Sequence, residues 1–413
     1  MTWPASEVAV LRVNGQEYTE WESVWIQERW NESFSFFKFT ANEGRVMVTD
    51  WHSDQFAPGN DVDITLGGQP VITGGTIITR QTSYNANQHM VQLTGKTYSF
   101  FPYKSSVMTD NGNFDGKTFV EIAHILLDEY GGFELIGTPD SKPYKKAQAE
   151  KGAKIWDYLE TLAREKGILL GTSAVLGIPQ VVGPHTGTII GTIADGVNVL
   201  SMQCTITCED LYQDIDVHAQ NQGDDQNNGT DASEKKGHSS GTAPKKAKLL
   251  IPMEHPPIDD AAVQLRADYE KKWTEATKIT ANATVQGWFT GGQSGQLWEA
   301  GKDVMVNCPL AMVEGVMKLR TVTFQQDNNS GTTTTLELVQ PWGLNDNINA
   351  DVSPPANKGL EKAPPPNKPP VSPPAKTGNN PLGAALGLGD IQATLGEKLG
   401  IGSISPSTQK GKR

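Results

Sequence analysis

The sequence predicts a mainly β protein of the α+β class, in which two similar antiparallel β-domains, each a small barrel or sandwich, flank an α+β insert. The first observation is a meander. Within residues 266–341, apolar residues alternate in runs separated by Gly and Asn turns, which is the period of two of half-buried strands. The second is a short pattern that occurs twice, formed by Gly59, Val62 and Ile64 and again by Gly301, Val304 and Val306. Repeats this short also arise by chance, so spacing alone leaves the duplication open.

The first β-domain is expected at residues 1–104. Asn14 and Gly15 lie between two runs of apolar residues, and this dipeptide predicts a hairpin because both central residues of a type I′ turn need a positive φ. Residues 33–40 are rich in Phe, which is typical of a strand that contributes aromatic side chains to a core. The first copy of the glycine pattern and further strand runs follow.

The middle domain is expected at residues 105–190. Thr118 and Glu121 have the spacing of a capping box, and apolar residues recur at helical spacing from there to Leu127. A second helix is predicted at residues 153–166, followed by two short strands. This change of period from two to 3.6 predicts the α+β insert.

The second β-domain is expected at residues 191–350. Within it, residues 223–248 contain Asp, Asn, Lys, Ser and Gly but almost no large apolar residue, so they are predicted to be a solvated loop between two paired strands. A helix is predicted at residues 259–277, directly before the meander.

The C-terminal part differs in composition from the rest of the chain. Residues 351–380 are a Pro-rich linker, expected to be extended and stiff. Residues 381–413 are a predicted partner-docking segment, too short and Gly-rich to be helical alone. Its candidate anchors are Leu386, Ile391, Leu395 and Leu399. From Ser353 onward there are eight Lys or Arg against three Asp or Glu, although the whole chain has a net charge of -12. A basic tail on an acidic body indicates either a second contact surface or a solvated linker.

Composition excludes several classes of function. A net charge of -12 and a pI near 5.1 argue against a protein that grips nucleic-acid phosphates. No apolar run approaches the roughly 20 residues of a membrane span, and the first residues lack the pattern of a secretion signal, so we expect synthesis and use in a cytoplasm. Cys204, Cys208 and Cys308 do not form a disulfide framework. Cys204 and Cys208 are expected to be buried thiols on one strand face.

No motif predicts catalysis, and we expect no enzymatic activity, catalytic residue, cofactor or metal. Residues 111–121 resemble a calcium loop, but Asn111 holds the first position and Glu121 lies one place early. A turn into a helix cap explains the same residues. Zinc-protease, nucleophile-elbow and phosphate-loop motifs do not occur. Three tryptophans could line a sugar groove, but a meander more often places them in the core or at a subunit interface, and as interface candidates they are Trp288, Trp298 and Trp342.

Taken together and in order, several segments resemble the Mu-like baseplate hub proteins of contractile-tailed bacteriophages, which are related to the late control and tail hub proteins. The resemblance covers about residues 8–343, and no single segment is diagnostic by itself. The segments are FAPGNDVDI, GKTFVEIAHILLDEYGG, IWDYLETLAREKGILL, QLRADYEKKW, VQGW, SGQLWEAGKDVMV and TLELVQPWG. Residues 223–248 and the tail depart from this pattern, so the resemblance assigns them no role.

The resemblance implies two tube-like antiparallel β-barrels in each chain and a homotrimer, so that three chains form a ring of six barrels. Such a ring would adapt the sixfold tail tube to the threefold central spike, with a channel for the tape measure protein and for DNA in transit. The implied partners are the central spike protein, the tail tube protein or a distal tube adaptor, the tape measure protein and the baseplate wedge proteins. The implied location is the virion tail baseplate, after assembly in the bacterial host cytoplasm.

Two alternatives stay open. One is a spike or secretion-needle subunit of the same barrel lineage, which would carry a β-helix or an OB-like domain that the sequence does not indicate. The other is a tail-associated peptidoglycan hydrolase, because two carboxylates are enough for glycoside hydrolysis and any sequence can supply them.

Overall fold

The computed structural model describes residues 4–43, 56–85, 89–109, 111–173, 175–183, 187–221, 234–291 and 295–341. The chain divides into two compact units, Met1–Lys362 and Ala363–Arg413, and all described residues belong to the first. This unit is mainly β, with several antiparallel sheets, as the sequence predicts.

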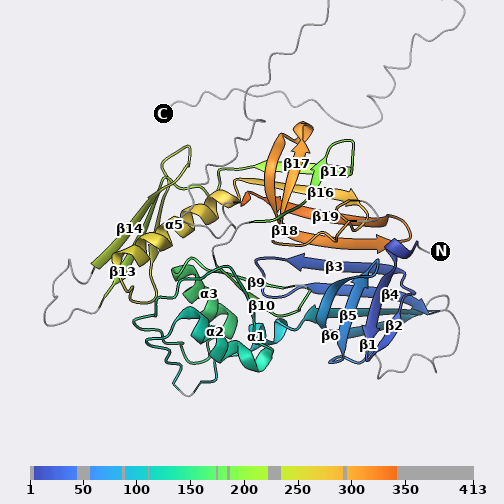
Figure 1. Cartoon of the computed structure of the whole chain (residues 1–413), viewed down its shortest axis with the longest axis horizontal. Coiled ribbons are helices and arrows are strands. Elements are labelled where there is room, and N and C mark those ends of the chain that lie inside the picture. The colour runs from blue at the N-terminus through green and yellow to red at the C-terminus, as the bar shows by residue number, and fades with distance from the viewer. Residues whose placement is uncertain are drawn as a thin grey trace, which may run out of the picture. The chain divides into compact units, whose positions relative to one another are not determined.

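Seven strands form the N-terminal half of a large sheet (Figure 1). They lie in the order β3-β4-β7-β6-β5-β1-β2, and each pairs antiparallel with its neighbours. Asn14 and Gly15 have φ of 51° and 82° and join the first two strands, which confirms the predicted hairpin. The strands are β1 (Ala9–Val13), β2 (Gln16–Tyr18), β3 (Ser23–Arg29), β4 (Phe36–Glu43), β5 (Asp61–Leu66), β6 (Gln69–Tyr84) and β7 (His89–Thr97).

Six strands form the C-terminal half of the same sheet. They lie in the order β12-β16-β19-β18-β17-β11, and β18 also pairs with β3 of the N-terminal half, so that one sheet of 13 strands contains both halves. Apolar side chains of both halves pack into a single core cluster. The strands are β11 (Ile189–Ala194), β12 (Val199–Ile206), β16 (Ile279–Gln286), β17 (Asp303–Cys308), β18 (Val313–Asp327) and β19 (Gly331–Val339).

The insert between the two halves has its own core. Thr118 caps α2 with the predicted capping box, since its hydroxyl accepts from the Glu121 amide at 3.3 Å and its own amide donates to Glu121 Oε2 at 2.7 Å. The helices bury their apolar faces against each other and against a three-stranded sheet in the order β8-β10-β9. The elements are α1 (Phe100–Lys104), α2 (Phe119–Leu127), η2 (Asp128–Tyr130), β8 (Glu134–Ile136), α3 (Ile155–Glu165), β9 (Leu169–Thr172) and β10 (Pro179–Val182). Among the described residues, further short helices are η1 (Ala5–Glu7) and η4 (Pro309–Ala311).

The structure corrects the prediction of a polar loop at residues 223–248. Residues 234–240 are strand β14 (Glu234–Ser240), which pairs antiparallel with β13 (Asp214–Gln220) and completes a three-stranded sheet with β15 (Lys248–Pro252). Helix α5 (Asp260–Ala276) packs on this sheet (Figure 1). A Cβ on Gly237 would lie 2.4 Å from the Val263 carbonyl oxygen. The strand needs small residues beneath the helix, so it lacks the apolar alternation by which strands are predicted.

Among the described residues, no helix is long and apolar enough to cross a membrane. Within the same part of the chain, no three His, Cys, Asp or Glu side chains are placed to bind a metal ion.

Candidate functional site

The two halves of the large sheet repeat one strand order. The order β3-β4-β7-β6-β5-β1 in the N-terminal half corresponds to the order β12-β16-β19-β18-β17-β11 in the C-terminal half. The neighbours within each order pair antiparallel, except that β11 runs parallel to β17 whereas β1 runs antiparallel to β5. The correspondence therefore extends over six strands and differs in one direction.

The residues of the repeated glycine pattern occupy equivalent places in the two halves. Gly59 and Gly301 have positive φ of 103° and 86°, and β5 and β17 each begin two residues later. The four apolar members, Val62, Ile64, Val304 and Val306, are all buried in the shared core.

A β-bulge marks the same position in the longest strand of each half. The pairing of β6 with β7 shifts between Ile77 and Thr79, and the pairing of β18 with β19 shifts between Leu319 and Thr321. The skipped residues, Ile78 and Arg320, follow Gly59 and Gly301 by the same number of residues. A bulge is a specific local irregularity. Because it occurs in both halves, it aligns Ile78 with Arg320 and sets the residue-by-residue correspondence of the two halves.

The halves meet where β18 pairs with β3. Thr321–Asp327 lie antiparallel to Ser23–Arg29, with Phe324 opposite Ile26, and both of these side chains are fully buried. Across the same junction the Gln27 side-chain amide donates to the Thr323 hydroxyl at 3.1 Å. The junction is thus a continuous, packed strand pairing.

Ionisable side chains are buried at one end of this junction. The Lys318 ammonium has no exposed surface; it donates to the Gly301 carbonyl oxygen at 3.1 Å, forms an ion pair with Asp303 at 3.1 Å, and lies 4.6 Å from the centre of the Trp30 ring. Glu28 is 2% exposed and accepts from the Ala300 amide at 3.3 Å. Burial, and then the charge of Glu299, raise the pKa of Glu28 to about 8.

Each half also has a strand edge with exposed side chains. In β6, Thr79, Gln81, Thr82 and Ser83 are exposed and Arg80 is half-buried, although they pair with β7 along one edge. Strand β12 pairs with β16 and ends the sheet, and it exposes the apolar side chains of Leu200 (57%) and Ile206 (44%). An edge strand with exposed apolar residues is a template for pairing with another chain.

Two of the three candidate tryptophans lie in the core, which is one of the two alternatives that the sequence left open for them. Trp288 and Trp298 are each 1% exposed and pack in the shared core cluster, so a partner cannot reach them. The other interface candidates lie outside the described residues and are Trp342, Leu386, Ile391, Leu395 and Leu399.

The cysteines differ from the prediction in part. Cys308 is buried and Cys204 is half-buried, but Cys208 is exposed because β12 ends at Ile206. Burial raises the pKa of the Cys204 thiol. Cys204 and Met202 pack against the core from the edge strand.

The segment that resembles a calcium loop forms a turn. The Asn113 side-chain oxygen accepts from the Asp115 amide at 2.8 Å, and the Asp115 carboxylate accepts from the Ala147 amide at 2.7 Å. These contacts support the alternative explanation, a turn that leads into the capped helix.

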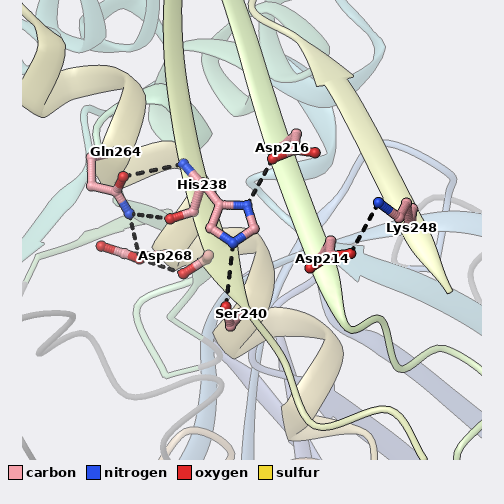
Figure 2. Close-up of polar contacts among 8 residues, drawn as sticks. Asp214, Asp216, His238, Ser240, Lys248, Gln264 and Asp268 are labelled. Atoms are coloured by element: carbon pink, nitrogen blue, oxygen red, sulfur yellow. Dashed lines mark hydrogen bonds and ion pairs between the residues drawn. The ribbon is translucent and has the colours of Figure 1, made fainter. Parts of the chain in front are cut away.

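Asp216, His238 and Ser240 lie close together on the three-stranded sheet of β13, β14 and β15 (Figure 2). The sequence alone does not indicate this arrangement. His238 Nδ1 lies 2.7 Å from Asp216 and Nε2 lies 3.2 Å from Ser240. Asp216 and His238 are directly opposite in the pairing of β13 with β14, and both side chains are about half exposed, at 42% and 52%. The contacts have the order of a catalytic triad, but they also explain a cross-strand polar pair on an open sheet face.

The chain is similar to known proteins, in sequence over one part and in fold over most of its length. Residues 8–97 match the family described as Mu phage baseplate assembly protein GpP-like, N-terminal. This part of the chain is similar to the N-terminal domain of that family. This match confirms the resemblance to Mu-like baseplate proteins that the sequence segments indicate. No curated protein matches the chain significantly.

Solved structures share the fold of this chain. It superposes on the 43 kDa tail protein of prophage MuSo2 from Shewanella oneidensis with a TM-score of 0.67 and 19% identity, over 82% of this chain and 99% of that one. The tail protein from Neisseria meningitidis MC58 gives the same TM-score at 20% identity, over 82% and 98%. The E. coli c3393 protein, a component of the type VI secretion system with structural similarity to the T4 tail proteins gp27 and gp5, gives 0.52 at 9% identity, over 80% and 76%. The fold of this chain is thus one that phage tail proteins share.

Proposed function

We propose that this chain is a structural hub subunit of a contractile-tail baseplate and that it assembles as a homotrimer. The observation that carries the proposal is the strand order that occurs twice in one chain, with the same bulge in each copy. Three chains would supply six similar β-modules, and closed rotational symmetry is the usual arrangement of identical chains. A trimer of this kind presents six similar faces to a sixfold tail tube and three identical faces to a threefold spike.

The remaining parts of the proposal follow from this role. The ring would bind the central spike protein, the tail tube protein or a distal tube adaptor, and the baseplate wedge proteins, and its channel would pass the tape measure protein and then DNA. It would function in the virion tail after assembly in the host cytoplasm. The acidic composition supports a channel that does not retain DNA, because like charges repel. The role requires neither catalysis nor a cofactor.

The mass of the purified full-length chain tests the proposal. Light scattering is expected to give three times the chain mass of 44.7 kDa, and electron microscopy of the same sample is expected to show rings with six similar lobes. A protein that stays monomeric at micromolar concentration and in the presence of tube protein contradicts the hub role.

A tail-associated peptidoglycan hydrolase is the second candidate, because Asp216, His238 and Ser240 have the contact order of a triad. A cell-wall zymogram separates the two candidates. The hub proposal predicts no clearing by the wild-type protein. Clearing that disappears in His238→Ala and persists in His218→Ala, a change at an exposed histidine of β13, would support the hydrolase.

A further inference from the structure

We propose that neighbouring copies of this chain join edge to edge, by antiparallel pairing of residues 80–83 of β6 in one copy with residues 203–206 of β12 in the next, with Thr82 opposite Cys204. The inference rests on the proposed trimer and adds its contact surface and register. A second copy of this chain is the partner, because the chain already contains one example of the same contact.

The internal example is the pairing of β18 with β3. The bulges align β6 with β18, so that Thr79 corresponds to Thr321 and Thr82 corresponds to Phe324. Residues 321–324 of β18 are buried, since β3 covers their edge. Their counterparts in β6 are exposed or half-buried. The β6 segment therefore has the same place in its half of the sheet as the buried β18 segment, but among the described residues no strand pairs with its second edge.

Strand β12 is the counterpart of β3. Ile26 lies opposite Phe37, which lies opposite Gly95, and Gly95 pairs with Ile77 directly before the first bulge. Cys204 lies opposite Ala281, which lies opposite Leu338, and Leu338 pairs with Leu319 directly before the second bulge. These two chains of pairings make Ile26 and Cys204 equivalent. Because Ile26 lies opposite Phe324, Cys204 belongs opposite Thr82.

The side chains of β12 fit this contact. Met202 and Cys204 point toward the core, as their counterparts Val24 and Ile26 do. Ile206, 44% exposed, takes the place of the buried Glu28 and would lie opposite Arg80, whose alkyl stem can cover it. An apolar residue on an open edge gains stability when a neighbouring strand covers it.

The space around Gly59 and Gly301, the two glycines of the repeated pattern, differs between the halves, and this difference fits the proposed pairing. A Cβ on Gly301 would lie 2.5 Å from the Trp30 ring, which follows β3. A Cβ on Gly59 would meet no atom of the described residues within 4 Å. The counterpart of Trp30 is the exposed Cys208, which follows β12. The end of β12 from the next copy would enter the open space beside Gly59.

Within one chain, β6 and β12 are separated in the sheet by β16, β19, β18, β3, β4 and β7. The pairing must therefore be made between copies, and it is heterologous: one edge of a copy meets the other edge of the next. Heterologous contacts form a ring when their rotation closes and a filament when it does not. In the proposed trimer, three contacts within chains alternate with three contacts between chains.

Cysteine cross-linking of the full-length protein tests the register. In a Cys208→Ser background, the variant Thr82→Cys places a thiol opposite the native Cys204, at the roughly 4.5–5.5 Å between Cβ atoms of opposed strand residues, close enough for a disulfide after a small adjustment. Because burial raises the pKa of the Cys204 thiol, the oxidation is run at about pH 9. The expected products on a non-reducing gel are covalent dimers and trimers, with no larger species.

The matched control is Ser83→Cys in the same background, because successive strand residues point to opposite faces. We expect it to give at least fivefold less cross-linked product, and Thr82→Cys combined with Cys204→Ser to give none. A trimer by light scattering in which Ser83→Cys cross-links as well as Thr82→Cys, or neither does, overturns the register and leaves the hub role in place. A monomer overturns both. Cross-linked species that grow beyond the trimer overturn the closed ring.

Discussion

Glu28 illustrates how one buried carboxyl can make the stability of this protein depend on pH. Its pKa of about 8 in the folded protein lies above the ordinary value of 4.5. Between these two values the folded state binds a proton that the unfolded state has lost, so the free energy of unfolding falls as the pH rises through this window. Below about pH 4.5 the carboxyl is protonated in both states and has no such effect.

We predict that Glu28→Gln stabilises the protein at alkaline pH. An amide keeps an oxygen that can accept from the Ala300 amide but cannot ionise, so the variant lacks the fall in stability. The expected gain is on the order of 5 kcal/mol at pH 8.5 and near zero at pH 4.5, because the pKa rises from 4.5 to about 8 on folding and one pKa unit corresponds to about 1.4 kcal/mol. Urea unfolding of both proteins across this pH range gives the difference. Equal pH profiles of variant and wild type would contradict the assignment.

Lys318 should be sensitive to the loss of its charge for a related reason. It is fully buried between Asp303, the Gly301 carbonyl and the Trp30 ring, and removing one partner of a buried ion pair leaves the other charge uncompensated. We predict that Lys318→Met lowers the free energy of unfolding by about 3–5 kcal/mol. The control is Lys302→Met, since Lys302 forms an exposed ion pair with Glu299 at 3.3 Å and should change stability by less than about 1 kcal/mol. Equal losses of stability in both variants would mean that burial does not increase the contribution of the Lys318–Asp303 ion pair to stability.

At the scale of elements, Ile206 on the edge strand β12 can be replaced by a positively or a negatively charged residue, and the effects of the two substitutions on the trimer can be compared. In the proposed register Ile206 lies opposite Arg80, so Ile206→Lys opposes like charges while Ile206→Asp opposes unlike charges. Both substitutions remove the same apolar side chain.

We predict that Ile206→Lys weakens the trimer about tenfold more than Ile206→Asp does, as measured by the trimer dissociation constant in analytical ultracentrifugation. Adding Arg80→Glu should reverse the order. A larger effect of Asp than of Lys in the Arg80 protein would place another residue opposite Ile206.

The elements that the sequence predicts are those with local causes. Asn14-Gly15 forms a hairpin because positive φ is a property of those two residues, and the Thr118 cap depends on a side chain three positions away. Strand β14 could not be predicted, because Gly237 is selected by the helix above it rather than by its neighbours in sequence. The alternation of apolar residues identifies β3 and β18 as strands. It does not show that they pair, because the pairing joins residues far apart in the sequence.

The features of the candidate site also divide into those with local causes, which the sequence predicts, and those that depend on distant partners, which it does not. The glycine pattern is visible in the sequence because both copies need a positive φ before a strand. The bulges at Ile78 and Arg320 have no signal in the sequence, because a bulge is defined by the partner strand. Trp288 and Trp298 were candidates for the core or for an interface because burial by the same chain and burial by a partner select the same residue types. The structure places both in the core.

At the scale of the whole molecule, the repeated sheet and the C-terminal tail should have separable roles. The two edges proposed to join neighbouring copies belong to β6 and β12, and both lie within the unit Met1–Lys362. The tail has a different composition, rich in Pro and then in Gly, with an excess of basic residues. Trimer formation should therefore not need the tail, whereas one contact with another tail component should.

We predict that a chain ending at Asp351 gives the same trimer mass and dissociation constant as the full chain, and loses binding to one of the spike, tube and tape measure proteins in pairwise pull-down. The matched variant keeps the full length and replaces Leu395 and Leu399 with Asp, which removes apolar anchors without shortening the chain. If anchors bind the partner, both variants lose the same contact. If truncation alone loses it, the Pro-rich linker or the basic charge is responsible, and if all three partners still bind both variants, the tail is a linker without a docking role.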